Sequence, residues 1–177
     1  ALIAAGLHEL REHGAADFSL RRVANACGVS CAAPYRHFKS RDGLILAIIS
    51  HVNDQWMLLQ EQICKIYKDD SHKCALELCV ALLRFLLANS GFCAVIVSDG
   101  RGLDTEQLKA RAKISEELAG FIRAHLAARG GTGASAERRI FSVLSMIYGA
   151  CLITEAHSES FDKTAQMTRE NIEFLLM

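Results

Sequence analysis

The sequence lacks a net charge, a membrane-spanning segment and the motifs of the common enzyme classes. Its 177 residues have a formal net charge of zero, which gives no global electrostatic case for binding nucleic acid. The longest apolar runs are interrupted by charged residues, and we find no signal peptide. There is no Gly-rich phosphate loop, no nucleophile elbow and no recognisable pair of catalytic carboxylates. We therefore expect a cytoplasmic protein that is not an enzyme, has no membrane partner and carries no cofactor.

The cysteines show neither a disulfide pattern nor a metal-binding pattern. There are seven, an odd number without a CxxC pair: Cys27, Cys31, Cys64, Cys74, Cys79, Cys93 and Cys151. We expect most of them to be small buried hydrophobic residues in a reducing cytosol. Histidines also occur in the C-terminal part of the chain, but no pair has tight ligand spacing such as HxxxH. We therefore predict no metal site.

Apolar residues recur with helical spacing along almost the whole chain. This periodicity predicts an all-α protein of about nine helices. The predicted helices cover residues 1–13, 20–26, 31–38, 41–66, 72–88, 92–97, 103–129, 137–157 and 161–176. Residues 98–102 and 130–135 are predicted to be loops because they are rich in glycine and small polar residues.

Residues 19–44 have the capping and turn residues of two short helices joined by a tight turn. Ser19 can cap the first helix, because a serine oxygen accepts from free backbone N–H groups one turn on. Gly28 follows that helix, where the backbone often needs a positive φ. Ser30 can cap the second helix. Two helices joined in this way describe a helix-turn-helix, whose second helix can lie in the DNA major groove.

Basic side chains are concentrated in the same segment. Residues 19–41 contain five basic residues and no acidic one: Arg21, Arg22, Arg36, Lys39 and Arg41. Residues 1–41 carry a net charge of +3, so the remainder of the chain carries −3. A local cluster of this kind can bind phosphate even when the whole protein is neutral.

The second helix of this unit ends in a Y-x-H-F motif, followed by a small polar link and a basic-acidic pair before a leucine. These residues are Tyr35, His37, Phe38, Lys39-Ser40, Arg41-Asp42 and Leu44, and Val23-Ala24-x-x-x-Gly28-Val29-Ser30 precedes them. The pattern resembles the DNA-binding head of the TetR family of bacterial transcriptional regulators. Pro34 departs from the bulky aliphatic residue usual at its position, but proline is tolerated near a helix start.

The resemblance implies a homodimer whose two heads bind a palindromic operator and whose body binds a small molecule that releases the DNA. Residues 1–50 would be the helix-turn-helix DNA-binding domain, and residues 51–177 the helical ligand-binding and dimerisation domain. The helices at 137–157 and 161–176 would pack as a four-helix interface between subunits. We expect a repressor that is associated with the nucleoid and is released by a small hydrophobic effector.

The predicted DNA contacts follow from side-chain chemistry around the second helix. They are Ser19, Arg21, Ser30, Cys31, Ala32, Ala33, Tyr35, Arg36, His37, Lys39 and Arg41. Tyr35, His37, Lys39 and Arg41 can each donate a hydrogen bond to a phosphate oxygen. Such contacts position a protein on DNA without reading the base sequence. Base reading would then fall to Cys31, Ala32, Ala33 and Arg36. Because three of these side chains are small, thymine methyl contacts and groove shape should matter more than bidentate hydrogen bonds.

The predicted effector contacts are aromatic and histidine residues of the body. They are Phe85, Phe92, Phe121, His125 and Tyr148, for each of which core packing is the alternative. Tyr148 has a polar tip within an apolar stretch, which makes it the best candidate for a hydrogen bond to the ligand. Two other functions stay open: a helical dimer that only binds or sequesters a small molecule, and a redox-sensing regulator that uses Cys31 at a helix N-terminus.

Overall fold

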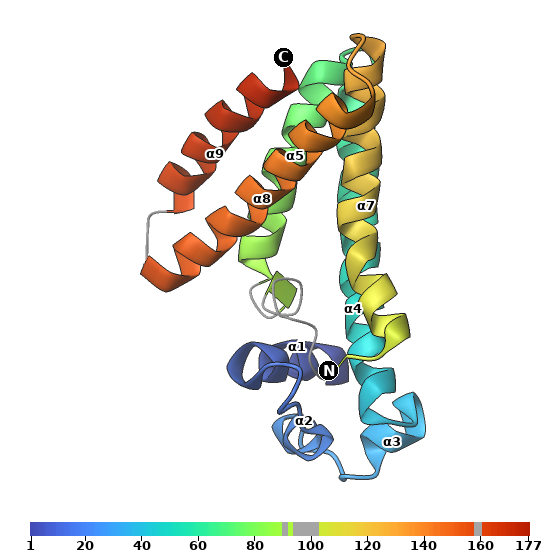
Figure 1. Ribbon diagram of the computed structural model, residues 1–177. Coiled ribbons are helices and arrows are strands. Elements are labelled where there is room, and N and C mark those ends of the chain that lie inside the picture. Colours follow the sequence, from blue (N-terminus) through green and yellow to red (C-terminus); the bar gives the residue numbers. More distant parts are fainter. Residues whose placement is uncertain (90–91, 94–102, 158–160) are drawn as a thin grey trace. The chain divides into compact units, whose positions relative to one another are not determined.

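The computed structural model describes residues 1–89, 92–93, 103–157 and 161–177, and these residues form eight helices and no strand. The helices are α1 (Leu2–His13), α2 (Leu20–Ala26), α3 (Ala33–Phe38), α4 (Arg41–Ile66), α5 (Ser71–Ala88), α7 (Thr105–Ala128), α8 (Gly133–His157) and α9 (Phe161–Leu176) (Figure 1). The all-helical prediction is confirmed. Of the helix predicted at 92–97, only residues 92–93 are described, and the loop predicted at 98–102 lies outside the described residues.

The predicted helix ends agree with the structure to within a few residues. Helices α4 and α9 have the predicted bounds, whereas α8 begins at Gly133 and includes part of the predicted loop at 130–135. Helix α7 begins two residues later than predicted because Asp104 and Gln107 cap it reciprocally. The Asp104 carboxylate accepts from the Gln107 backbone N–H at 2.8 Å, and the Gln107 side-chain oxygen accepts from the Asp104 N–H at 2.8 Å.

The chain divides into two compact units. Unit 1 comprises Ala1–Gln55 and Asn89–Lys113, and unit 2 comprises Trp56–Ala88 and Ile114–Met177, so α4 and α7 contribute residues to both. Within unit 1, the Asn53 amide donates to the Ala110 carbonyl at 2.9 Å, and the Gln107 amide donates to the Asp42 carbonyl at 2.8 Å. These bonds join the first turns of α7 to α4. A division into functional domains at residues 50 and 51 stays a prediction.

Unit 1 has a core made by α1, α2 and the first half of α4. Its fully or almost fully buried side chains include Leu10, Phe18, Leu20, Val23, Leu44, Ile45, Ile48 and Ile49. Burial of such a side chain contributes about 1.5–3 kcal/mol. Helix α1 approaches α4 closely at Gly6, where a Cβ atom would lie 2.5 Å from Cδ1 of Ile48. The core therefore fixes the segment between α1 and α4, which contains the helix-turn-helix.

A Gly43→Ala substitution tests how tightly the junction of α3 and α4 is packed. A Cβ atom at Gly43 would lie 2.1 Å from the backbone carbonyl oxygen of Phe38, which cannot rotate away as a side chain could. We expect the variant to lose about 1–3 kcal/mol of unfolding free energy in chemical denaturation, through overpacking. Gly120→Ala is the matched control, because nothing lies within 4 Å of its Cβ position in α7. The control should gain about 0.5–1 kcal/mol from helix propensity, and equal stability of the two variants would contradict the packing argument.

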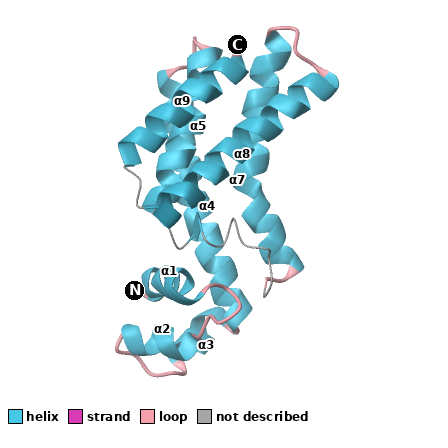
Figure 2. Cartoon of the chain, turned by 60° about the vertical axis from the view of Figure 1, so that its left-hand side comes forward, coloured by secondary structure: helices cyan, strands magenta, loops and turns pink. Residues whose placement is uncertain are grey.

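Unit 2 contains α5, α8 and α9, which pack against one another (Figures 1 and 2). Its buried core includes Leu78, Leu82 and Leu86 of α5, Val143 and Ile147 of α8, and Ile172 of α9. Arg169 of α9 donates to the Glu77 carboxylate of α5 at 2.7 Å, and this hydrogen bond raises the pKa of Arg169. No helix in the described ranges is both long and apolar enough to span a membrane.

Candidate nucleic-acid interface and effector site

The first helix of the predicted helix-turn-helix forms as the sequence predicts. The Ser19 hydroxyl accepts from the Arg22 backbone N–H at 3.4 Å, which caps α2. After α2 the chain turns at Gly28, which has a φ of 65° that glycine adopts without strain. The turn is closed by the Val29 N–H, which donates to the Ala24 carbonyl at 3.1 Å.

The second helix starts later than predicted, and Ser30 does not cap it. Helix α3 begins at Ala33, its N-cap residue is Ala32, and no side chain caps it. The reason is Pro34, which has no N–H to give to the Ser30 carbonyl as a helix would require. That carbonyl instead accepts from the Ala33 N–H at 2.9 Å and closes a tight turn. Predicting a helix at residues 31 and 32 was therefore wrong.

Most of the predicted DNA-contacting side chains in α3 and the turn before it are exposed to solvent. Tyr35, Arg36 and His37 are exposed, with 55% of the Tyr35 surface accessible, while Pro34 faces the interior. Ser30, Cys31 and Ala32 are also exposed in the preceding turn, and Ala33 is half-buried. An exposed tyrosine beside an arginine and a histidine can donate to the phosphate backbone.

Lys39 forms the corner between α3 and α4. Its φ is 64°, the only positive φ at a non-glycine residue in the described part of the chain, and its side chain is exposed. The next residue, Ser40, caps α4 as expected for a serine at a helix start, since its hydroxyl accepts from the Gly43 N–H at 3.0 Å. This corner holds an exposed ammonium group at the end of α3.

Two of the five clustered basic residues bind acceptors within unit 1. The Glu9 carboxylate, only 6% exposed, accepts from Arg22 Nε at 2.7 Å and from the Ser19 N–H at 3.0 Å. The hydrogen bond with Glu9 raises the pKa of Arg22. The Arg41 guanidinium donates to the Ala15 carbonyl and, at 2.9 Å, to the Asp42 carboxylate. Arg41 thus holds the segment before α2 against the start of α4.

The remaining basic residues of the cluster are Arg21, Arg36 and Lys39. All three are exposed, and none makes an ion pair within the described residues. They lie at the start of α2, in α3 and at the corner after α3. The described part of unit 1 therefore offers three unpaired cations, together with Tyr35 and His37, around one helix-turn-helix.

The predicted effector residues belong to different units. Phe92 is fully buried in unit 1, whereas the other four residues belong to unit 2. Phe85 packs on Trp56 with ring centroids 5.5 Å apart, and the Tyr148 hydroxyl is hydrogen-bonded to Ser115. Phe121 is exposed on α7.

His125 is buried among polar partners at one end of unit 2. Its Nδ1 lies 3.2 Å from the Ser71 hydroxyl, and its Nε2 lies 3.1 Å from the Leu176 carbonyl oxygen. Burial lowers the pKa of His125, so the neutral ring is favoured. Through the contact with Leu176, His125 joins α7 to the end of α9.

Two buried polar atoms that sequence reasoning missed lie on one face of α4. Within the described residues, neither the Trp56 indole Nε1 nor the Gln60 Oε1 has a hydrogen-bond partner. Trp56 is fully buried and Gln60 almost so. Residues four apart on a helix are neighbours, so the two side chains extend from the same face of α4. The sequence did contain a signal for this site, because Gln60 is a polar residue within the otherwise apolar stripe of α4.

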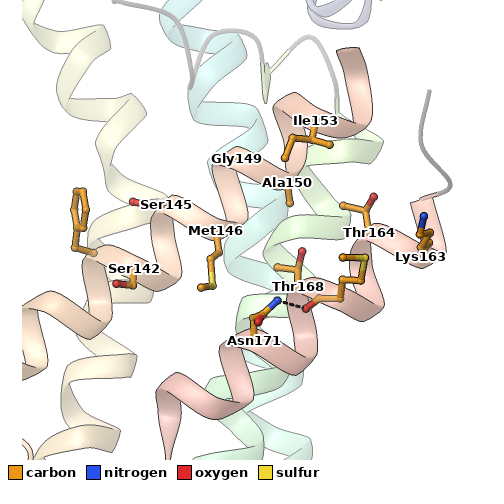
Figure 3. Close-up of a pocket in the computed structure, with 12 residues that line it drawn as sticks. Ser142, Ser145, Met146, Gly149, Ala150, Ile153, Lys163, Thr164, Thr168 and Asn171 are labelled. Atoms are coloured by element: carbon orange, nitrogen blue, oxygen red, sulfur yellow. Dashed lines mark hydrogen bonds between the residues drawn. The ribbon is translucent and has the colours of Figure 1, made fainter. Parts of the chain in front are cut away.

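A groove of about 670 Å³ lies between α8 and α9 (Figure 3). It is lined mainly by apolar and small polar side chains, among them Phe141, Met146, Ile153, Met167 and Thr168. Several large apolar residues of these helices are exposed at or near it: Phe141, Leu152, Ile153, Met167 and Phe174. None of the five predicted effector residues lines this groove.

No cluster of three or more metal-ligating side chains occurs in the residues that the structure describes. The geometry instead defines a helix-turn-helix protein with a further helical unit and an apolar C-terminal face. Residues 2–48 match the family model described as "Bacterial regulatory proteins, tetR family". The helix-turn-helix segment of this chain is therefore similar to the DNA-binding segment of that family.

The chain is similar to known proteins in two respects: the sequence of its helix-turn-helix segment and the fold of almost the whole chain. The nucleoid occlusion factor SlmA of Marinomonas sp. (strain MWYL1) is 33% identical over 91 residues, which span 50% of this chain and 45% of that protein. A TetR transcriptional regulator from Legionella pneumophila has a TM-score of 0.80 at 18% identity, covering 98% of this chain and 94% of that one. The regulator FadR from Bacillus subtilis, solved in complex with stearoyl-CoA, has a TM-score of 0.75 at 13% identity, covering 99% and 96%. At these identities the structural matches establish the fold alone.

Proposed function

We propose that this protein is a homodimeric transcriptional regulator that binds operator DNA through α3 and responds to a small hydrophobic effector. The observation that carries the DNA-binding proposal is the exposed row of Tyr35, Arg36 and His37 on α3, followed by the exposed Lys39. Arg21 adds a further unpaired cation at the start of α2. Ser19 and Arg41 act mainly by fixing the unit, because Ser19 caps α2 and Arg41 binds backbone carbonyls.

DNA retention on operator and random sequences over a salt series tests this proposal. A regulator that neutralises several phosphates should lose affinity steeply as salt rises and should still prefer its operator. Binding that is weak and equal on all sequences would instead favour a dimer that only sequesters a small molecule. The expected repression of transcription and association with the nucleoid both require DNA binding, so they fail if this proposal fails.

The apolar face of α8 and α9 supports a homodimer. Met167, Asn171 and Phe174 follow one another at helical spacings of four and three residues on α9, and Phe141 is exposed on α8. Monomeric proteins rarely expose so many large apolar side chains on neighbouring helices. Two copies that pair through residues 137–157 and 161–176 would cover these side chains and present two heads to a palindromic site.

The buried, unpartnered atoms of Trp56 and Gln60 support an effector site beside α4 in unit 2. Leaving such an atom unpaired costs about 1–3 kcal/mol, which a ligand can recover if it supplies the missing partner. An effector with an acyl or aromatic body and one polar end group would fit a tryptophan donor beside an amide acceptor. Since FadR from Bacillus subtilis was solved with stearoyl-CoA, that thioester is the first probe we would use.

Gln60→Met tests the effector site and removes the unpaired amide oxygen at nearly constant volume. We expect thermal stability to stay the same or rise, because the variant no longer buries an unsatisfied acceptor. Stearoyl-CoA binding, measured by calorimetry, should weaken at least about tenfold if the amide contacts the ligand. Gln62→Met, an exposed position on the same helix, is the control and should change neither quantity. A loss of stability with unchanged binding would contradict the assignment of Gln60 to the site.

A further inference from the structure

Two cysteines of unit 2 lie close enough to react with each other. Cys64 is in the last turn of α4 and Cys74 is in the first turn of α5, and their Sγ atoms are 3.7 Å apart. The Cys74 thiol donates a hydrogen bond to Cys64. Both side chains are half-buried, so that small molecules in the solvent can reach them.

We propose that Cys64 and Cys74 form a reversible intrachain disulfide when the protein meets a hydroperoxide. A disulfide has an S–S bond of about 2.05 Å, so the two sulfur atoms must approach by roughly 1.7 Å. Rotation about the Cα–Cβ bonds of two half-buried side chains can supply that movement. The pair connects the end of one helix to the start of the next across a four-residue link, residues 67–70.

The two cysteines would have different roles in the reaction. Burial, together with the hydrogen bond to Cys64, raises the pKa of Cys74 to about 11, so Cys74 keeps its proton. The Cys64 thiolate attacks the terminal oxygen of the hydroperoxide and the O–O bond breaks. The other oxygen takes up a proton and leaves as an alcohol, or as water when the oxidant is hydrogen peroxide, so that Cys64 becomes a sulfenic acid. The Cys74 thiol then attacks the Cys64 sulfur, the S–O bond breaks, and the Cys74 proton joins the departing hydroxide to form water. The peroxide is reduced by two electrons, the two thiols lose two electrons and two protons, and a dithiol reductant reverses the step.

The other five cysteines do not compete for this role. Cys79, Cys93 and Cys151 are fully buried, and burial raises the pKa of Cys79 to about 12. Cys27 is half-buried and Cys31 is exposed, and both belong to unit 1. Oxidation of the exposed Cys31 alone would join two molecules rather than two helices, so a Cys31→Ser background keeps the two reactions apart.

Disulfide formation should be measured in the Cys31→Ser protein after peroxide treatment, by alkylation of the remaining thiols and peptide mass spectrometry. We expect a cross-link between the peptides that contain Cys64 and Cys74, which is lost on reduction. The bond closes a loop of eleven residues and should raise the melting temperature by about 5–10 °C. Neither result depends on DNA binding, so this proposal can fail while the proposed function stands.

Single substitutions separate the two roles. In Cys74→Ser the sulfenic acid has no partner, and dimedone should trap it on Cys64. In Cys64→Ser neither the cross-link nor a dimedone adduct on Cys74 should appear. The proposal is overturned if both thiols of the Cys31→Ser protein are still alkylated after peroxide treatment, or if Cys64 is found linked to Cys79. It is also overturned if Cys64→Ser gives the same adduct yield at Cys74 as Cys74→Ser gives at Cys64.

Discussion

Replacing Tyr35 and His37 together by alanine should weaken operator binding about 100-fold or more. Each side chain is exposed on α3 and can donate one hydrogen bond to a phosphate, and a hydrogen bond to a charged group is worth about 1.5–3 kcal/mol. Two such losses give about 3 kcal/mol or more, which corresponds to that factor in affinity. The loss should be the same on all DNA sequences, because phosphate contacts position the protein without reading bases.

The double variant should keep the fold, because the surfaces that it changes already face solvent. His51→Ala is the matched control, since His51 is an exposed histidine on α4 outside the helix-turn-helix. Lys39→Ala gives a useful contrast, because removing a cation lowers the salt slope by about 0.9 for each phosphate that is no longer neutralised. Loss of the hydrogen bonds from Tyr35 and His37 should leave the slope almost unchanged. If the double variant binds the operator as tightly as the unsubstituted protein does, neither Tyr35 nor His37 contacts the DNA.

Phe141→Asp combined with Phe174→Asp should convert the proposed dimer to a monomer at micromolar concentration. The two rings are 74% and 76% exposed, so the substitutions cost a single subunit little. In a dimer each ring contributes about 1.5–3 kcal/mol by burial, and every carboxylate would be buried without a partner. The dissociation constant measured by sedimentation equilibrium should rise at least about 1000-fold.

The control for the monomer variant is Ile66→Asp, because Ile66 is 71% exposed but lies at the end of α4. That protein should sediment as the unsubstituted one does. The Phe141 and Phe174 variant should also bind a palindromic operator more weakly, since one head cannot occupy both half-sites. If it sediments as a dimer, the apolar face of α8 and α9 is not the interface.

The helices themselves could be predicted because their signals are local. Apolar spacing, the cap at Ser19 and the turn at Gly28 act over four or five residues, and the structure confirms each of them. The error at Ser30 was also local. Pro34 removes the N–H that a helix starting there would need, and a stricter count of donors would have found it.

The candidate sites could be predicted only in part, because they depend on residues far apart in the sequence. The basic cluster at 19–41 is visible as composition, but only the fold decides which of its cations are paired. Arg22 meets Glu9 from thirteen residues away, and Arg41 meets the Ala15 carbonyl from twenty-six residues away. The aromatic residues predicted for the effector site are divided between the two units, since helical spacing gives a face but not the neighbour that covers it.

The sequence by itself determined an all-helical chain, the position of the helix-turn-helix and the family that this segment resembles. Local capping and periodicity are enough for these features, since they need no distant contact. Tertiary structure alone decided which cations stay exposed, which polar atoms of α4 are buried without partners, and that Cys64 faces Cys74. These features arise when separate helices pack against each other. Packing brings together or buries groups that are far apart in the sequence, and their spacing in the sequence does not indicate the contact.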